Sequence, residues 1–294
     1  MTLQPLTFLI LLVLAGGSAL AEPPAAPSEL VSKYASQLDV SDFPAAPAPT
    51  SPPPFTLNFS KVYTHRYFYQ QTLENHVSSP GNARDTTFTS TSSGDLMVYA
   101  EPDQTAQVRL EKLRMQSTAT VDGKLDKTGQ KAPPTWIGNL NQAGGFDEAV
   151  AGQKPLMALL FPVPSKSLAV GESVETPVEF DLPVMGAIYE TKGTRRITCT
   201  GYVTAGKRLC AKLEQTIALS VVDEDSHNRI DATGKSVSFF APSEGRFIRS
   251  VGVMTLRMTP PALPGYAFDG EKPPPKTPTP KMTSDNVVRI ILAE

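Results

Sequence analysis

The chain has 294 residues, of which 40% are hydrophobic and 19% are charged. At roughly 150 residues per domain, this length allows one large domain or two small ones. The 27 basic and 29 acidic residues leave a net charge of −2, which excludes the generally basic surface that attracts nucleic acid. Any charge-driven partner must therefore use a local patch.

Residues 1–21 have the form of a cleavable signal peptide. An apolar run spans Phe8–Leu14 and ends before Gly16, far short of the about 20 residues of a spanning helix. Ala19 and Ala21 supply the small-x-small pattern of a cleavage site, and no cysteine lies nearby to carry a lipid. We expect cleavage at about Ala21 and a periplasmic or extracellular protein without a transmembrane span in the mature chain. An uncleaved N-terminal anchor is the alternative.

Proline-rich segments flank the expected domain. Nine of the 28 prolines lie between Pro23 and Pro54, and eight lie between Pro260 and Pro280, where they favour extended, poorly packed backbone. The first segment, residues 22–54, also predicts a short helix that starts at Ser28. The second, residues 259–281, leads to a final strand within residues 282–294. We expect this strand to add to a sheet edge, in its own chain or in another.

The region between them, residues 55–258, shows the period-two alternation of β-strands with one solvated face. The clearest examples are Thr176–Val184 and Leu209–Val221, and a break at Thr204–Lys207 predicts a β-hairpin. Further strands are expected over Phe55–Gln71, Asp85–Ser90, Asp95–Tyr99, Gln104–Met115, Ser236–Phe240 and Arg246–Met258. The best internal helix candidate is Pro155–Phe161. The sequence thus predicts a mostly β fold, an antiparallel curved sheet that forms a half-barrel or a sandwich with one or two short helices.

The two cysteines, Cys199 and Cys210, flank the predicted hairpin turn. In an exported chain this arrangement predicts a cross-strand disulfide. Cys210 alternates with Arg208 and Lys212 on the polar face, so Cys199 must face the same way, which requires a bulge near the turn. Two reduced thiols are the main alternative, and a redox-active pair is disfavoured because the sequence has no Cys-x-x-Cys motif.

No catalytic or metal-binding constellation stands out. His65, His76 and His227 have no metal-ligand spacing, and the acidic run from Asp223 to Asn228 lacks the glycine and the terminal glutamate of an EF-hand loop. The sequence has no Gly-x-Ser-x-Gly or Ser-x-x-Lys motif and no strand followed by a glycine-rich phosphate loop. We therefore expect no cofactor and no enzyme activity, while a hydrolase with a dispersed site stays open.

Two strand surfaces could bind a partner. Tyr63, His65, Tyr67 and Tyr69 share one face of a strand, where they could line a cavity for an amphipathic ligand or simply pack across the sheet. The second surface has no acidic residue in its sequence interval and could meet phosphate head groups, an acidic glycan or an acidic partner. It could equally be a solvated face that blunts a sheet edge. Its basic members are Lys192, Arg195, Arg196, Lys207, Arg208 and Lys212.

The segment Leu160–Ser173 carries a proline-containing loop and a Val-Gly-Glu-Ser turn ahead of the predicted hairpins. Over Leu159–Met258 the chain resembles uncharacterised exported bacterial proteins, which are similar in outline to periplasmic lipoprotein carriers with a curved half-barrel sheet. The usual aromatic residue after the turn is replaced here by Val174. The resemblance implies a non-enzymatic carrier or envelope protein, and it transfers no functional residue.

The leading hypothesis is a non-catalytic exported β-protein that binds a hydrophobic or anionic envelope component such as lipid. The first alternative is a structural or protein-interaction module of the cell envelope, whose last strand pairs with a partner's sheet edge. The second is the dispersed-site hydrolase.

Overall fold

The computed structural model describes residues 43–59, 64–78, 86–121, 124–150, 152–184, 187–222, 229–259 and 281–293. The expected signal peptide, the helix at Ser28, Tyr63, the acidic run with His227 and most of both proline-rich segments lie outside these ranges. Among the described residues, no helix has the length and apolar character needed to cross a membrane.

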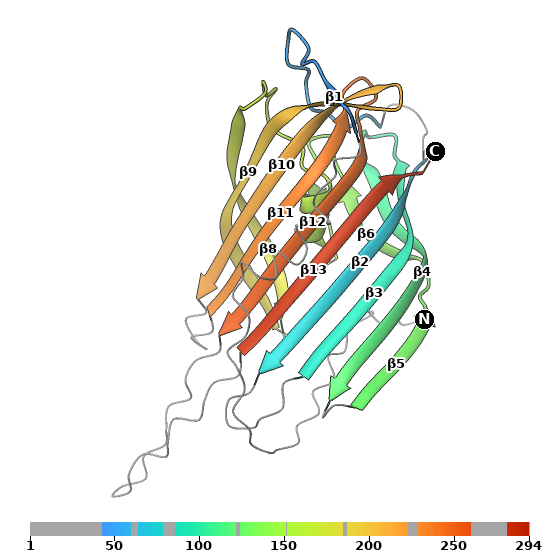
Figure 1. Cartoon of the computed structure of the whole chain (residues 1–294), viewed down its shortest axis with the longest axis vertical. Helices are drawn as coiled ribbons and strands as arrows, with labels where there is room; N and C mark the ends of the chain where they lie inside the picture. The colour runs from blue at the N-terminus through green and yellow to red at the C-terminus, as the bar shows by residue number, and fades with distance from the viewer. Residues whose placement is uncertain are drawn as a thin grey trace, which may run out of the picture.

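One antiparallel sheet contains all the described strands and confirms the predicted mostly β fold (Figure 1). The strands are β1 (Ala45–Ala46), β2 (Thr64–Ser78), β3 (Thr86–Ala100), β4 (Ala106–Val121), β5 (Lys124–Lys131), β6 (Thr135–Leu140), β7 (Phe146–Asp147), β8 (Ser173–Val184), β9 (Ala187–Ala205), β10 (Arg208–Val222), β11 (Arg229–Ala241), β12 (Arg246–Thr259) and β13 (Lys281–Leu292). The described helix is α2 (Gln153–Leu160), at the position predicted from the sequence.

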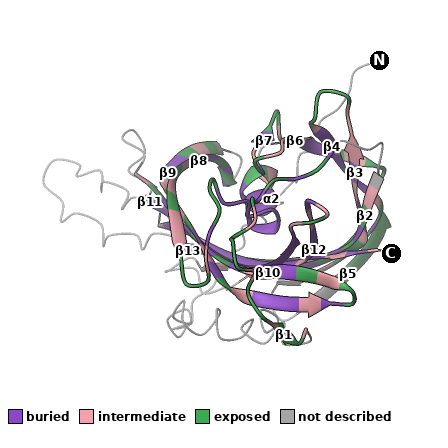
Figure 2. Cartoon of the chain, turned by 90° about the horizontal axis from the view of Figure 1, so that it is seen from above, coloured by how far each residue is buried: buried purple, intermediate pink, exposed green. Residues whose placement is uncertain are grey.

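The sheet follows the order β1-β9-β10-β11-β12-β13-β2-β3-β4-β6-β7, with β8 paired to β9 and β5 paired to β4. It curves around α2 without closing into a barrel (Figure 2). The last strand was expected at a sheet edge. Instead it lies inside the sheet, because β13 pairs with β12 on one side and with β2 on the other. It joins the N-terminal and C-terminal hairpins into one surface.

Two glycines explain why α2 lies close to the sheet. A Cβ atom on Gly234 of β11 would lie 3.1 Å from Leu159, and a Cβ on Gly252 of β12 would lie 3.1 Å from the same side chain. The bare backbone at these positions leaves room for the helix. The side chain of Gln215 on β10 anchors it further, since Nε2 donates to the Ala158 carbonyl at 3.1 Å.

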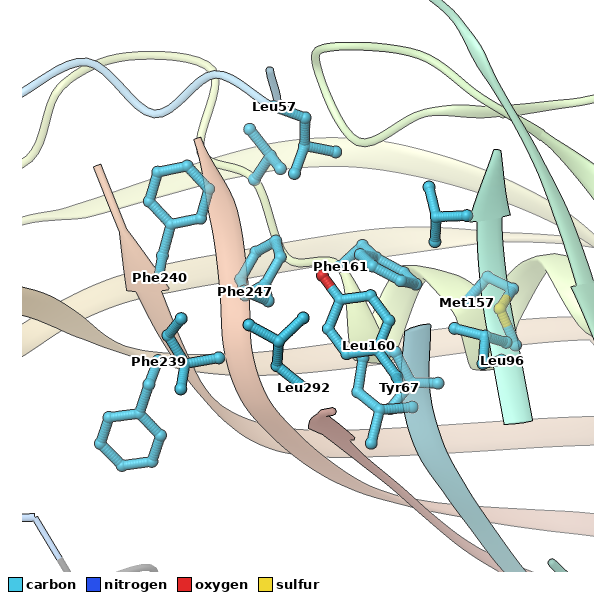
Figure 3. Close-up of a cluster of buried hydrophobic side chains, with 14 of the residues drawn as sticks. Leu57, Tyr67, Leu96, Met157, Leu160, Phe161, Phe239, Phe240, Phe247 and Leu292 are labelled. Atoms are coloured by element: carbon cyan, nitrogen blue, oxygen red, sulfur yellow. The ribbon is translucent and has the colours of Figure 1, made fainter. Parts of the chain in front are cut away.

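The core above the helix is aromatic. Phe161, directly after α2, packs edge-on against Tyr67 and Phe247 (Figure 3), with ring centroids 6.1 and 5.8 Å apart. Its ring centroid also lies 5.9 Å from that of Phe146. The segment before β2 also enters this core, because Phe55, Leu57 and Phe59 are buried although they lie outside any strand. The start of the predicted strand Phe55–Gln71, residues 55–59, thus lies outside any strand, whereas its described part from Thr64 onward belongs to β2.

Two further boundaries differ from the prediction. The described part of the run Asp85–Ser90, from Thr86 onward, and the run Asp95–Tyr99 belong to one strand, β3, whose register shifts between Ser93 and Asp95. Gly94 lies at this bulge, where a Cβ would be 2.7 Å from the Glu111 carbonyl oxygen. Small polar residues that resemble a turn in sequence here stay within the ladder because the neighbouring strands hold them on both sides. β1, within the expected proline-rich tail, pairs with β9.

Candidate functional site

The two faces of the sheet differ in charge. We call the face against which α2 packs the inner face and the opposite one the outer face. Strand alternation assigns every paired residue to one of them. On β10, for example, Gln215, Ile217 and Leu219 are buried on the inner face, while Glu214 and Thr216 are exposed on the outer face.

The inner face is divided at the row of cross-strand partners that contains Gln215. The part that extends from this row to the C-terminal end of β10 and the neighbouring strand ends is called the lower inner face. On β8 to β10 it comprises Val174, Thr176, Val178, Phe180, Leu182, Val184, Tyr189, Thr191, Gly193, Arg195, Ile197, Gln215, Ile217, Leu219 and Val221. On β11 to β13 it comprises Ile230, Ala232, Gly234, Ser236, Gly252, Met254, Leu256, Met258, Met282, Ser284 and Val288. On β2 to β4 it comprises Gln71, Leu73, Asn75, Val77, Thr86, Phe88, Ser90, Ser92, Met115, Ser117 and Ala119.

The side formed by β8 to β13 is an apolar cluster below α2. Phe180, Leu219 and Ile230 are buried in it, together with methionines at three positions. Met258 and Met282 are direct cross-strand partners, and unbranched, polarisable methionine side chains adapt to irregular shapes. This side can therefore repack around an apolar group.

The side formed by β2 to β4 is more open and mixes apolar with polar groups. Leu73, Asn75 and Phe88 are half-buried on it. Ser90 is buried and lies beside Ser117, with the two hydroxyl oxygens 3.4 Å apart. This wall carries hydroxyl and amide groups but no charge among its members defined above.

Several buried polar atoms on the inner face have no hydrogen-bond partner among the described residues. They are Oδ1 of Asn75, Oε1 of Gln215, and the hydroxyls of Ser238 and Ser250. Ser238 and Ser250 face each other across β11 and β12. Because buried polar groups in proteins are nearly always satisfied, these atoms mark positions where water or a ligand's polar group would be favourable.

Among the members of the lower inner face named above on β8 to β13 and β2 to β4, Arg195 of β9 is the only charged residue. It lies between Thr176 on β8 and Ile217 on β10, and its Nε is buried without a partner. Burial lowers the pKa of the guanidinium below its usual value. Its chain neighbour Arg196 is exposed on the outer face, where Nη2 donates to the Ser173 hydroxyl at 3.4 Å.

The other basic residues predicted to form an anion patch are not gathered around Arg195. Lys192 lies 3.1 Å from Glu179 and 3.6 Å from Glu190. Elsewhere, Arg208 pairs with Glu244 at 2.8 Å and Lys212 with Glu214 at 3.2 Å, while Lys207 is exposed at the hairpin turn. Glu179 comes from the neighbouring strand β8, Glu244 from the turn between β11 and β12, and Glu190 and Glu214 lie just outside the sequence interval. The absence of acidic residues within the interval therefore did not show that its basic residues are paired.

The predicted tyrosine ladder lies within the core at its described positions. Tyr67 and Tyr69 are buried, and burial raises the pKa of both phenols. The Tyr69 hydroxyl donates to Oε1 of Gln71 at 2.7 Å. His65 is half-buried, and burial, with the nearby Arg246, lowers its pKa. Tyr67 and Tyr69 thus adjoin the lower inner face from the aromatic core above it.

The predicted disulfide is wrong, since Cys199 and Cys210 are both free, buried thiols. Cys199 pairs with Leu213, and Gly201 pairs with Lys212, which leaves Thr200 as an extra residue in β9. This bulge turns Cys199 to the inner face, opposite to the face of Cys210. The two residues are also about 10 Å out of register at 3.4 Å per strand residue, beyond the reach of a disulfide.

A histidine meets a carboxylate and a hydroxyl on the outer face of β2. His76 Nε2 lies 2.8 Å from Glu74 Oε1, and its Nδ1 lies 3.3 Å from the Thr87 hydroxyl. The surrounding backbone N–H groups belong to strands paired on both sides, so they are not available as oxyanion donors. We interpret this group as a cross-strand contact. The described residues contain no cluster of three or more metal-binding side chains.

Sequence reasoning identified Arg195 but grouped it with the outer-face cations, and it missed the open wall around Leu73, Asn75 and Phe88. One signal was available. In β10 and β11 every second residue is uncharged over the whole strand, and the same holds in β12 from Ile248 onward, whereas the residues between include Glu214, Asp231 and Arg257. What could not be seen was that these uncharged positions join with those of β2 to β4 into one surface.

The fold is that of a curved, open, single-sheet antiparallel β-protein. Known proteins with similar sequences or structures provide little further information about this chain. No family model and no curated protein matches the chain, so the resemblance to exported bacterial proteins stays a prediction. A structure described as lipid–protein interactions in lipovitellin is similar with a TM-score of 0.41 and 11% identity, over 81% of this chain and 26% of that chain. This chain thus spans about a quarter of the lipovitellin chain. A DUF1329 family protein from Desulfovibrio piger has a TM-score of 0.13 and 8% identity, over 78% of this chain and 85% of that chain. Because both TM-scores are low, function has to be inferred from this chain's own residues.

Proposed function

We propose that the protein is a non-catalytic, exported binder that holds a hydrophobic or amphipathic molecule of the lipid class against its lower inner face. The observation that carries this proposal is the separation of charge between the two faces. Charged side chains line the outer face, whereas the described members of the lower inner face on β8 to β13 and β2 to β4 include one charged residue. The β2 to β4 wall is half-exposed.

Placing an apolar chain on such a wall costs little desolvation free energy, because no ionised group on the wall has to lose its water. Its burial gains about 25 cal/mol per Å², so burying about 300 Å² of apolar surface contributes on the order of 7 kcal/mol. The hydroxyl and amide groups keep the wall wetted when it is empty, and the methionines of the neighbouring cluster adapt when it is filled. Phe88 and Leu73 are the residues that we expect to touch the ligand.

The test begins with the full chain purified without detergent and examined by denaturing mass spectrometry for co-purifying lipid. Binding is then measured with a neutral fluorescent amphiphile, the methyl ester of 11-(dansylamino)undecanoic acid. Phe88→Glu places a charge on the wall and is expected to weaken ester binding at least tenfold. The matched control, Phe68→Glu, makes the same change at an outer-face phenylalanine that is 51% exposed and is expected to leave binding unchanged.

Failure of the wild-type protein to bind the ester, together with the absence of co-purifying lipid, would refute the proposal. Equal loss in the two variants would place the ligand elsewhere. Circular dichroism of both variants separates loss of binding from loss of folding.

A further inference from the structure

Among the described members of the lower inner face named above, Arg195 is the only charged residue, and the others are apolar or neutral. Its inner-face neighbours are apolar or neutral: Thr176 and Ile217 across the ladder and Ile197 two positions along β9. Among the described residues no carboxylate pairs with it. Glu175 and Glu179 on the adjacent strand are exposed on the outer face, where they accompany Arg196 and Lys192 instead.

A half-buried, unpaired guanidinium is costly for the fold. Partial desolvation penalises the charged form, consistent with the lowered pKa of Arg195, and its buried Nε leaves a donor unsatisfied. A hydrophobic residue would fit better beside Ile197 and Ile217 if stability alone mattered. An anion that reaches this face from outside the described residues would supply the missing partner.

We propose that Arg195 binds the oxyanion head group of an amphiphile whose apolar chain lies on the lower inner face. This inference rests on the proposed function and specifies its ligand as a monoanionic amphiphile with a carboxylate or phosphate head. A guanidinium matches either head group because its parallel N–H donors form two charge-assisted bonds.

The position of Arg195 suits this role. Its register row continues through Ile217 to Gly234 and Met254, and strands are spaced about 4.8 Å apart. Strand β9, which carries Arg195, therefore lies about 10 Å from the point where Leu159 of α2 contacts Gly234 on β11. A head group at Arg195 would stand beside the helix, with Leu219 and Met254 within reach of the first part of its chain.

The experiment compares the 11-(dansylamino)undecanoic acid probe with its methyl ester, which has the same chain but no charge. For the wild type we expect the acid to bind at least tenfold more tightly than the ester, because hydrogen bonds to a charged group contribute about 1.5–3 kcal/mol. Arg195→Met should weaken acid binding about tenfold to hundredfold and leave ester binding within twofold. Arg195→Lys should restore part of the acid's affinity.

Arg196→Met is the matched control. It removes an arginine one residue away on the outer face and should change neither affinity. Arg195→Met should also unfold at the same temperature as the wild type or higher, whereas loss of a structural arginine would lower the midpoint. Displacement of the acid probe by dodecyl phosphate and by laurate shows which oxyanion Arg195 prefers.

The outcomes separate the two proposals. If the ester binds but Arg195→Met binds the acid like the wild type, the head-group assignment is overturned and the proposed function stands. If neither probe binds the wild type, both fail. Should Arg195→Met not fold, the wild type alone still decides, because equal affinities for acid and ester would exclude a head-group contact.

Discussion

The lower inner face and the outer face belong to the same strands but are stabilised in different ways. Arg195 and Arg196 are adjacent in the chain, yet one is half-buried among isoleucines and the other is exposed beside a serine. Inner-face residues gain from burial of apolar surface, which depends little on pH or salt. Outer-face residues form ion pairs, which water and salt weaken.

The two faces also differ in their capacity to bind a ligand. Charged side chains that already form ion pairs with residues on neighbouring strands gain little free energy from binding a ligand. The inner face, by contrast, keeps unpartnered polar atoms and an unpaired cation, at a cost to stability that a ligand would offset. Four measurements can test this difference between the two faces.

Removing the central ring of the inner-face core should have the largest effect. Phe161 is 1% exposed and contacts three other aromatic rings, so Phe161→Ala should lower the free energy of unfolding by about 4 kcal/mol. Urea denaturation measures the change. Phe68→Ala, an outer-face phenylalanine, should cost less than about 0.5 kcal/mol. Similar losses in both variants would contradict the division into a packed and a solvated face.

The two thiols provide one reporter on each face. Burial raises the pKa of Cys210 to about 11 and also raises that of Cys199. At pH 8 the ionised fraction of Cys210 should be on the order of a hundredfold below that of an exposed cysteine. Both thiols should therefore resist an aromatic disulfide reagent until the protein is unfolded. Rapid labelling, or a mass lower by two hydrogens before reduction, would show that the thiols are exposed or bonded.

Asp95 is the exception on the outer face, a buried carboxylate 3.0 Å from Arg66 and 3.2 Å from Lys112. Burial alone would raise its pKa, but hydrogen bonds from both cations outweigh it and hold the pKa below its usual value. Because the folded-state pKa is depressed, Asp95 stabilises the fold above the unfolded-state pKa of about 3.9, and this contribution is lost as pH falls through the folded-state value.

Asp95→Asn should therefore lower the free energy of unfolding by about 1.5 kcal/mol at pH 7, a modest value because both cations are partly exposed. The difference from the wild type should shrink as the pH drops below about 4. Thermal unfolding at a series of pH values measures it, and a difference independent of pH would argue against the ion pairs as its source.

The smallest effect is expected at Lys192, which pairs with Glu179 and Glu190 but is exposed. Water competes with both carboxylates, so Lys192→Ala should leave the unfolding midpoint unchanged within error, at low and at high salt. A clear salt-dependent loss would mean that the outer face is held together more strongly than its exposure implies.

Much of the fold could be predicted from the sequence because the alternation of apolar and polar residues is local. The hairpin between β9 and β10, the strands β11 and β12, and helix α2 all lie where the periodicity placed them. The errors have a common physical cause. The extra residue of β4 opposite Gly94 and Thr200 of β9 form bulges that only the neighbouring strand can specify, and the bulge at Thr200 turned Cys199 away from Cys210.

The candidate site was less predictable because it depends on strands that are far apart in the chain. The sequence alone determined that the strands are amphipathic and that the fold is mostly β, since these properties follow from residue order along a single strand. The tertiary structure alone decided that β13 joins β12 to β2, which brings Leu73 and Phe88 onto the same face as Met254 and Arg195. Strand order is set by hydrogen bonding between distant segments, and no local pattern encodes which segments will meet.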